Sequence, residues 1–209
     1  TITVNPTAEM NDPEDMVVCN AEVTDAVEFT TDNTGGTTTY TWTNDTPAIG
    51  LAATGSGDLP SFTAINTGTE PIVATVVVTP LFTDDINCDG ISQTFTITVN
   101  PSAQVDDPND LIICDGETTS IIYTTQNTGG TTSYSWVNDT PGIGLAASGN
   151  GNIESITVSN SGNTPVVATV IVTPTFENEG IACQGDSQTF TITVNPSSQV
   201  DEVEDQILC

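Results

Sequence analysis

Cysteine is the residue type with the clearest chemical potential in this 209-residue sequence, which contains five of them. Thiols either bind metals or form disulfides, and structural metal sites combine cysteines in CxxC pairs or with histidine. The sequence has no CxxC pair and no histidine, so the thiols favour disulfide bonds over a metal site. The cysteines are Cys19, Cys88, Cys114, Cys183 and Cys209.

Two kinds of disulfide pairing are open. The simplest joins Cys19 to Cys88 and Cys114 to Cys183, each pair 69 positions apart (88 minus 19, 183 minus 114). Closing a loop of that size stabilises a domain by about 4 kcal/mol in the chain-entropy model. If the first cysteine of each pair ends an edge strand at one pole of its domain and the second lies in a hairpin at the other, the bonds instead join neighbouring domains. Cys209 takes the position of Cys19 and Cys114, so its partner would lie in another domain.

One acidic stretch matches the start of a calcium-binding loop. Asp85, Asn87 and Asp89 fit the pattern D-x-[DN]-x-D-G, in which alternate oxygens face one ion. Thr96 stands where the loop would need its bidentate glutamate, and the matching stretch at 180–185 has no acidic side chain. We therefore read the stretch as an acidic turn and expect no resident cofactor, with calcium as the one possibility left open.

Charge excludes several classes of function. The chain has 28 Asp and Glu and no Lys, Arg or His, for a formal charge of -28. Nucleic acids and anionic membrane surfaces bind through basic side chains, so neither is an expected partner. Catalysis could use only carboxylates, yet Glu9 is replaced by Gln104 in the second copy, and the retained pair Asp12 and Asp107 lies in a linker. We expect no enzyme activity.

The elements that position these residues are organised by a repeated strand. The segment SQTFTITVNPS occurs at 92–102 and again at 187–197, 95 positions later (187 minus 92). Phe95, Ile97 and Val99 alternate with threonines, a period of two that predicts a half-buried strand. The Asn-Pro pair that follows ends the strand, because proline cannot donate to a sheet.

A period of 95 residues is the size of one small all-β domain and too long for a solenoid turn. The strand's tail, TITVNP, also opens the chain. We therefore predict the last strand of a preceding repeat at 1–6, two complete repeats at 7–101 and 102–196, and the first strand of a following repeat at 197–209.

Each repeat carries the pattern of an Ig-like β-sandwich. The motif NTGGTT predicts a turn that leads into a strand with one tryptophan, and a single tryptophan on a central strand is usually a core anchor. Apolar runs such as IGLAA at 49–53 complete seven or eight expected strands, and no helical stripe is present. The predicted core residues are Trp42, Trp136, Phe95 and Phe190.

The order of these motifs resembles the PKD-like and Ig-like tandem repeats of very large Bacteroidetes cell-surface proteins, among them gliding-motility adhesins. The motifs lie at 40–55, 66–80 and 88–101, with copies at 134–149, 160–174 and 183–196. The resemblance implies β-sandwich domains in a linear array, export by type IX secretion, and an extracellular place at the cell surface. It implies no catalytic residue.

The expected function is a structural repeat segment of an extracellular adhesin stalk or filament. Its expected partners are neighbouring repeats of the same chain and other copies in a filament. The alternative is a calcium- or carbohydrate-binding module of a secreted multidomain protein. Asn44 and Asn138 begin N-x-T patterns, but Asn-Asp is equally a plain turn signal, so glycosylation stays open.

Overall fold

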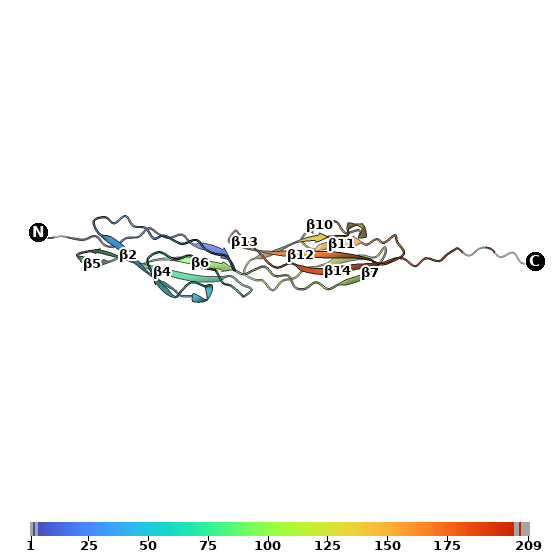
Figure 1. Ribbon diagram of the computed structural model, residues 1–209, viewed down its shortest axis with the longest axis horizontal. Coiled ribbons are helices and arrows are strands. Elements are labelled where there is room, and N and C mark those ends of the chain that lie inside the picture. The colour runs from blue at the N-terminus through green and yellow to red at the C-terminus, as the bar shows by residue number, and fades with distance from the viewer. Residues whose placement is uncertain (1, 3, 203–204, 206–209) are drawn as a thin grey trace, which may run out of the picture. The chain divides into compact units, whose positions relative to one another are not determined.

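A computed structural model describes residues 2, 4–202 and 205, and nearly all of its regular structure is β-strand (Figure 1). The predicted all-β class is confirmed. The chain divides into two compact units: unit 1 holds residues 1–104, 126–132 and 175–185, and unit 2 holds the remainder. Cys209 and most of the last seven residues, part of the predicted following strand, lie outside the described residues.

The first copy of the repeat forms a six-stranded sheet in unit 1. Its order is β1-β6-β4-β2-β3, with β5 paired to β4. Figure 1 labels β2, β4, β5 and β6 of this sheet. Strand β1 runs parallel to β6 and pairs Cys19 with Asn100, whereas the other strand pairs are antiparallel. The strands are β1 (Met16–Cys19), β2 (Thr37–Asn44), β3 (Thr54–Ser56), β4 (Ile72–Asp84), β5 (Ile86–Asp89) and β6 (Gln93–Asn100).

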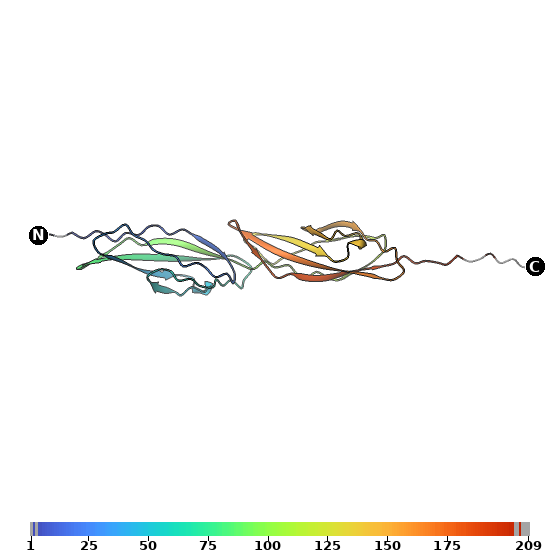
Figure 2. The same cartoon turned by 45° about the horizontal axis from the view of Figure 1, so that its top comes forward.

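The second copy repeats this sheet in the order β10-β9-β12-β14-β7, with β13 paired to β12. Figure 2 shows the antiparallel pair β12 and β14 in orange and red. Strands β8 and β11 form a separate two-stranded sheet, at the place where the first copy has two isolated bridges. The strands are β7 (Leu111–Cys114), β8 (Thr118–Ile121), β9 (Thr131–Asn138), β10 (Ser148–Asn150), β11 (Ile153–Thr157), β12 (Val166–Asn178), β13 (Ile181–Gln184) and β14 (Gln188–Asn195).

Each copy has its own hydrophobic core. The side chains of Trp42, Phe95, Trp136 and Phe190 are all buried. Each tryptophan lies over a glycine of the neighbouring strand, where a Cβ at Gly55 or Gly149 would collide with the indole ring. The short strands β3 and β10 therefore need glycine at the position that faces the tryptophan.

The run IGLAA, predicted as a strand, is not one. Its first residue ends a single turn of 3-10 helix, Pro47–Ile49, and the second copy has the same turn at Pro141–Ile143. Proline suits the first helical position, and Gly50 ends the turn in the left-handed region with φ 97°. Ile49 and Leu51 are buried, so the apolar run reflects packing of the turn and loop against the core.

Candidate functional site

The predicted calcium stretch forms a β-hairpin. Asp85 occupies the turn with φ 53°, and the following residues pair with β4 as strand β5. The side-chain oxygen of Asn87 accepts a hydrogen bond from the Thr83 hydroxyl at 3.1 Å. Among the described residues no group of three or more His, Cys, Asp or Glu could hold a metal ion. Calcium binding by Asp85, Asn87 and Asp89 therefore gains no support from this hairpin.

Removal of calcium should leave the stability of the protein nearly unchanged. A site held at 100 times its Kd would contribute about 2.7 kcal/mol, which shifts the melting temperature of a domain this size by about ten degrees or more. We expect excess EDTA to cause no such shift in thermal unfolding followed by circular dichroism. A fall of that size, reversed by added calcium, would show that these carboxylates are ligands.

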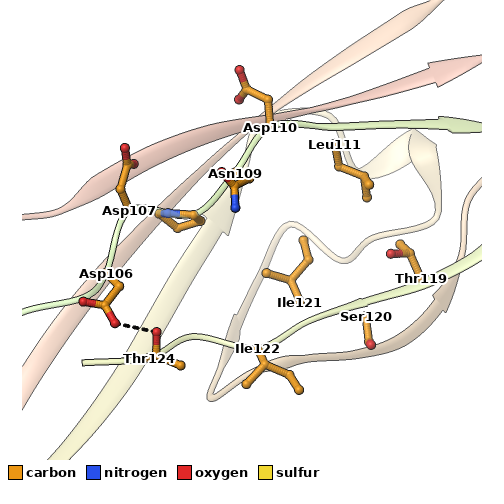
Figure 3. A pocket seen from close by; sticks show the side chains of 11 residues that line it. Asp106, Asp107, Asn109, Asp110, Leu111, Thr119, Ser120, Ile121, Ile122 and Thr124 are labelled. Atoms are coloured by element: carbon orange, nitrogen blue, oxygen red, sulfur yellow. Dashed lines mark hydrogen bonds between the residues drawn. The ribbon is translucent and has the colours of Figure 1, made fainter. Parts of the chain in front are cut away.

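The acidic linker of the second copy borders a cavity of about 330 Å³ in unit 2 (Figure 3). The carboxylates of this linker do not point toward one common place in the cavity. Asp106 accepts a hydrogen bond from the Thr124 hydroxyl at 2.6 Å, and Asp110 accepts one from the backbone N–H of Thr191 at 2.7 Å. Asp107 and Asp110 point away from the apolar side of the cavity, so the linker carboxylates form no catalytic pair.

Because the sequence has no Lys, Arg or His, its carboxylates have no cationic side chain to pair with. Several exposed carboxylates instead accept hydrogen bonds from backbone N–H groups. Asp45 accepts the N–H of Thr75 at 2.8 Å, and Asp139 in the second copy accepts that of Thr169 at the same distance. These backbone hydrogen bonds, followed by those from the adjacent threonine hydroxyls, lower the pKa of both carboxyl groups below the usual 3.8. The retained acidic turns therefore stabilise the sheet.

The stabilisation by Asp45 should disappear in acid. Because its pKa is lowered in the folded state, its contribution is present above 3.8 and is lost as the pH falls through the lowered pKa. We expect Asp45→Asn to destabilise the protein at about pH 6 and to have a smaller effect at about pH 2.5, measured by urea unfolding. Asp107→Asn is a matched control, because it removes one negative charge from a linker carboxylate that accepts no hydrogen bond from the described residues. Equal losses for Asp45→Asn at both pH values would contradict this role.

The two N-x-T asparagines are buried and bonded. The Asn44 amide nitrogen donates to the Leu51 carbonyl at 3.1 Å, and that of Asn138 donates to the Leu145 carbonyl at 3.0 Å. Both side chains are buried. An amide nitrogen held in this way cannot carry a glycan in the folded protein, so these residues act as turn residues.

Among the described cysteines there is one disulfide, between Cys19 and Cys183, which are 164 positions apart. Cys88 and Cys114 are free thiols, so the pairing of Cys19 with Cys88 and of Cys114 with Cys183 is wrong. The other arrangement considered, a bond between successive copies of the repeat, is the one that forms. Cys19 and Cys183 both belong to unit 1.

Sheet register explains why Cys19 and Cys88 cannot meet. The parallel pairing of β1 with β6 places Cys19 opposite Asn100, at the end of the sheet where β4 begins. Cys88 pairs with Phe82, about ten residues further along β4. At about 3.3 Å per residue the two thiols lie about 33 Å apart along the strand, whereas a disulfide needs Cα atoms within about 7 Å.

A pair of asparagines supports the disulfide. The Asn100 amide nitrogen donates to the Asn178 carbonyl at 3.3 Å, and the Asn178 amide nitrogen donates to the side-chain oxygen of Asn100 at 3.0 Å. Asn100 is completely buried. Beside it, the Asn20 amide nitrogen donates to the Ser102 hydroxyl at 3.0 Å. The strand end that carries Cys19 is thus bonded both to the chain leaving β6 and to the β12–β13 hairpin.

A second line of contacts lies between the loop at 69–71 and the NTGG turn of the second copy. Asn127 donates its amide nitrogen to the carbonyls of Ser102 and Thr69, at 3.2 and 3.4 Å. The Thr128 backbone N–H donates to the Thr69 carbonyl at 2.9 Å, and its hydroxyl donates to Glu70 at 2.7 Å. A Cβ on Gly129 would touch the ring of Pro71.

We call these contacts the joint, and all of its residues lie in unit 1. It comprises residues 19–20, 69–71, 100–104, 127–129 and 178–185. The sequence interpretation treated the asparagines at 100 and 127 only as a strand exit and a turn. Their repetition in both copies, as Asn-Pro and as Asn-Thr-Gly-Gly, was the signal that they hold neighbouring segments.

Comparison with known proteins finds remote structural likeness only. No family model matches the chain, and no curated protein matches it. Three domains of the bacteriophage RB49 outer capsid protein Hoc share 13% identity, with a TM-score of 0.48, over 91% of this chain and 70% of theirs. Fibronectin(III)-like modules of Clostridium thermocellum CbhA share 10% identity, with a TM-score of 0.33, over 96% of this chain and 100% of theirs.

Domains EC22-24 of mouse cadherin-23 share 12% identity, with a TM-score of 0.39, over 91% of this chain and 65% of theirs. Likenesses at these values are too remote to assign a function. Across the residues that the structure describes, no helix has the length and apolar character needed to span a membrane.

Proposed function

We propose that this chain is a structural repeat segment of an extracellular adhesin stalk or filament at the cell surface, with no catalytic role. The observation that carries the proposal is the Cys19–Cys183 disulfide, which links successive copies of the repeat covalently. A module that only binds a ligand has no need of such a link. A shaft under tension does, because the bond passes load from one copy to the next.

The disulfide removes most of the chain from the path of a pulling force. Tension applied at the two ends runs through 1–19, crosses the bond, and continues through 183–209. Residues 20–182 lie in the closed loop and bear no load through the backbone. Unfolding inside that loop therefore cannot lengthen the chain, which is a useful property in a thread exposed to shear.

Composition supports a place outside the cell. Disulfides persist in oxidising compartments and are rare in the cytosol. The absence of Lys and Arg removes every trypsin-type cleavage site, and the charge of -28 disfavours lateral sticking of threads. The motif resemblance supports the finer proposal of a gliding-motility-type adhesin of Bacteroidetes, exported by type IX secretion.

Electron microscopy of intact cells labelled with antibodies against the folded chain tests this function. We expect label along threads that project from the surface, at regular intervals if the repeats are arrayed. Label confined to the cell interior would overturn the proposal. Specific binding of the purified chain to a glycan on an array would instead favour the carbohydrate-binding alternative.

A further inference from the structure

We propose that Cys88 and Cys114 are each one half of a further joint, made with another repeat of this type. Cys88 would bond to the first-strand cysteine of a repeat that precedes it, and Cys114 to the hairpin cysteine of a repeat that follows. This inference rests on the proposed array, but the test below separates the two. Both cysteines carry free thiols here.

The strand end at Cys114 is built like the one at Cys19. The Cys114 backbone N–H donates to Glu117 at 3.0 Å, as that of Cys19 donates to Glu22 at 2.9 Å. Cys114 pairs with Asn195 in parallel strands, as Cys19 pairs with Asn100. Cys114 is exposed, so its thiol is accessible for the same bond.

The chain leaving the second copy is held in the same way as the chain leaving the first. The Ser197 hydroxyl donates to Asp115 at 2.6 Å, at the positions where Asn20 and Ser102 are bonded in the formed joint. The backbone N–H of Asp115 donates to the Asn195 carbonyl at 2.8 Å, as that of Asn20 does to the carbonyl of Asn100. The second copy therefore already has the arrangement that the first copy contributes to the formed joint, namely a strand end with an exposed cysteine bonded to the chain that leaves the copy.

The hairpin at Cys88 matches the one that bonds Cys19. Cys88 pairs with Phe82 across the hairpin, as Cys183 pairs with Phe176. The amide nitrogen of Asn5 donates to the Asp84 carbonyl at 2.6 Å. This bond reproduces the one from Asn100 to the carbonyl of Asn178 in the formed joint. An exit asparagine thus already occupies its place on the Cys88 hairpin.

What is missing at Cys88 is the strand end that covers it. A cavity of about 230 Å³ is lined by Asn5, residues 84–86 and Cys88. Ile86 is 70% exposed, whereas its equivalent in the formed joint, Ile181, is 37% exposed. Cys88 is partly exposed, whereas Cys183 is 2% exposed.

The turn beside the hairpin shows the same difference. A Cβ on Gly35 would meet no atom within 4 Å, whereas one on its equivalent, Gly129, would touch Pro71. The first copy therefore presents two uncovered surfaces, the Cys88 hairpin and the turn at Gly35. In the second copy the equivalent surfaces are covered by the strand end at Cys19 and by the loop at 69–71. The occupant that fits is the corresponding part of a repeat of this type.

The bond forms by oxidation of two thiols. The Cys114 thiolate attacks a disulfide oxidant, such as glutathione disulfide, and releases one thiol from it. The hairpin thiolate of the next repeat then attacks the mixed disulfide and releases the second thiol. Two cysteine thiols are oxidised to one disulfide, and the oxidant, reduced to two thiols, takes up their two protons.

Bonds at every joint would make an array nearly inextensible. Cys88 and Cys114 are separated by 26 positions (114 minus 88), a segment that contains β6, the linker and β7. With each first-strand cysteine bonded to the hairpin of the next repeat, a continuous covalent path runs alternately through such a segment and a disulfide. One segment and one disulfide together advance two repeats. One segment spans at most about 90 Å when fully stretched, so two repeats could not be drawn beyond that length.

The test uses a chain lengthened by a copy of residues 7–101 inserted after Pro196, with Cys88→Ser in the first copy and Cys19→Ser in the inserted copy, so that each bonded peptide is unique. It is oxidised with glutathione disulfide, its free thiols are alkylated, and it is cleaved with pepsin for mass spectrometry. The peptide around Cys114 reads LIIC and is unique, so its partner can be identified. We expect this peptide to be linked to the hairpin peptide of the inserted copy, and Cys114 to lose its reactivity with maleimide.

Alkylated Cys114, or Cys114 bonded to any other cysteine, would overturn the inference. The Cys19–Cys183 bond in the same digest shows that the chain has folded, and a Cys88→Ala version replaces the serine variant if that bond is missing. Serine at the hairpin cysteine of the inserted copy should restore the maleimide reactivity of Cys114. If Cys114 does not bond to the inserted copy, the proposed surface fibre is still tested independently by electron microscopy of labelled cells. If Cys114 does bond but no label is found at the cell surface, only the proposed fibre is overturned.

Discussion

A single molecule pulled from its two ends should lengthen to about 160 Å with its disulfide intact and to about 700 Å after reduction. The first value counts the 46 residues at 1–19 and 183–209, and the second counts all 209. The difference arises because residues 20–182 lie inside the loop that the Cys19–Cys183 bond closes. Optical tweezers or atomic force microscopy would measure both lengths on the same chain, with and without a reducing agent.

Two pairs of substitutions control this experiment. Cys19→Ser with Cys183→Ser should give the long extension without any reductant, because no loop is closed. Cys88→Ser with Cys114→Ser removes the same number of thiols and leaves the bond in place, so its extension should remain short. A short extension in the first pair, or a long one in the second, would show that a different bond carries the load.

Replacement of Trp136 by alanine should destabilise unit 2 by about 3–5 kcal/mol. The indole ring is buried in the core of the second copy and lies against Gly149, so its loss leaves a large cavity. For a domain this size the melting temperature should fall by about 12 °C or more. Thermal unfolding followed by far-UV circular dichroism would show this as an earlier transition.

The neighbouring residue provides a matched control. Val137 is on the same strand and is 51% exposed, so Val137→Ala should change stability by less than about 1 kcal/mol. In the Trp136→Ala variant, Trp42 is the remaining tryptophan and reports on unit 1 by its fluorescence. Equal losses for Trp136→Ala and Val137→Ala would mean that the tryptophan is not the core anchor.

The hairpin cysteines of the two copies, Cys88 and Cys183, occupy equivalent positions but differ in bonding and exposure. Cys183 is 2% exposed beneath the strand end of Cys19, whereas Cys88 occupies an equivalent hairpin and stays partly exposed. The two hairpins differ in sequence and in the length of their turn, but both place the cysteine opposite a phenylalanine of the long strand, Phe82 or Phe176. The difference in exposure follows what covers each cysteine, since the strand end of Cys19 is bonded over Cys183. Thiol reactivity in this protein therefore reports on whether a joint is filled.

The sequence by itself determined the period, the fold class and the hydrophobic pattern of the strands. Alternation of Phe95, Ile97 and Val99 with threonine is a local signal, because successive side chains of a strand point to opposite faces whatever the rest of the chain does. Repetition of the same letters 95 positions later (187 minus 92) required no structure to interpret. The absence of basic side chains likewise follows from composition alone.

The tertiary structure decided which two of the described cysteines pair. Spacing made Cys19 and Cys88 the simplest pair, but spacing says nothing about which end of a sheet a strand occupies. The parallel pairing of β1 with β6 sets that end, since it places Cys19 beside Asn100 and away from the hairpin. Parallel pairing joins strands that are distant in the sequence and leaves no turn signal to read. For the same reason the joint, whose residues come from five separate segments, could be found only in the folded chain.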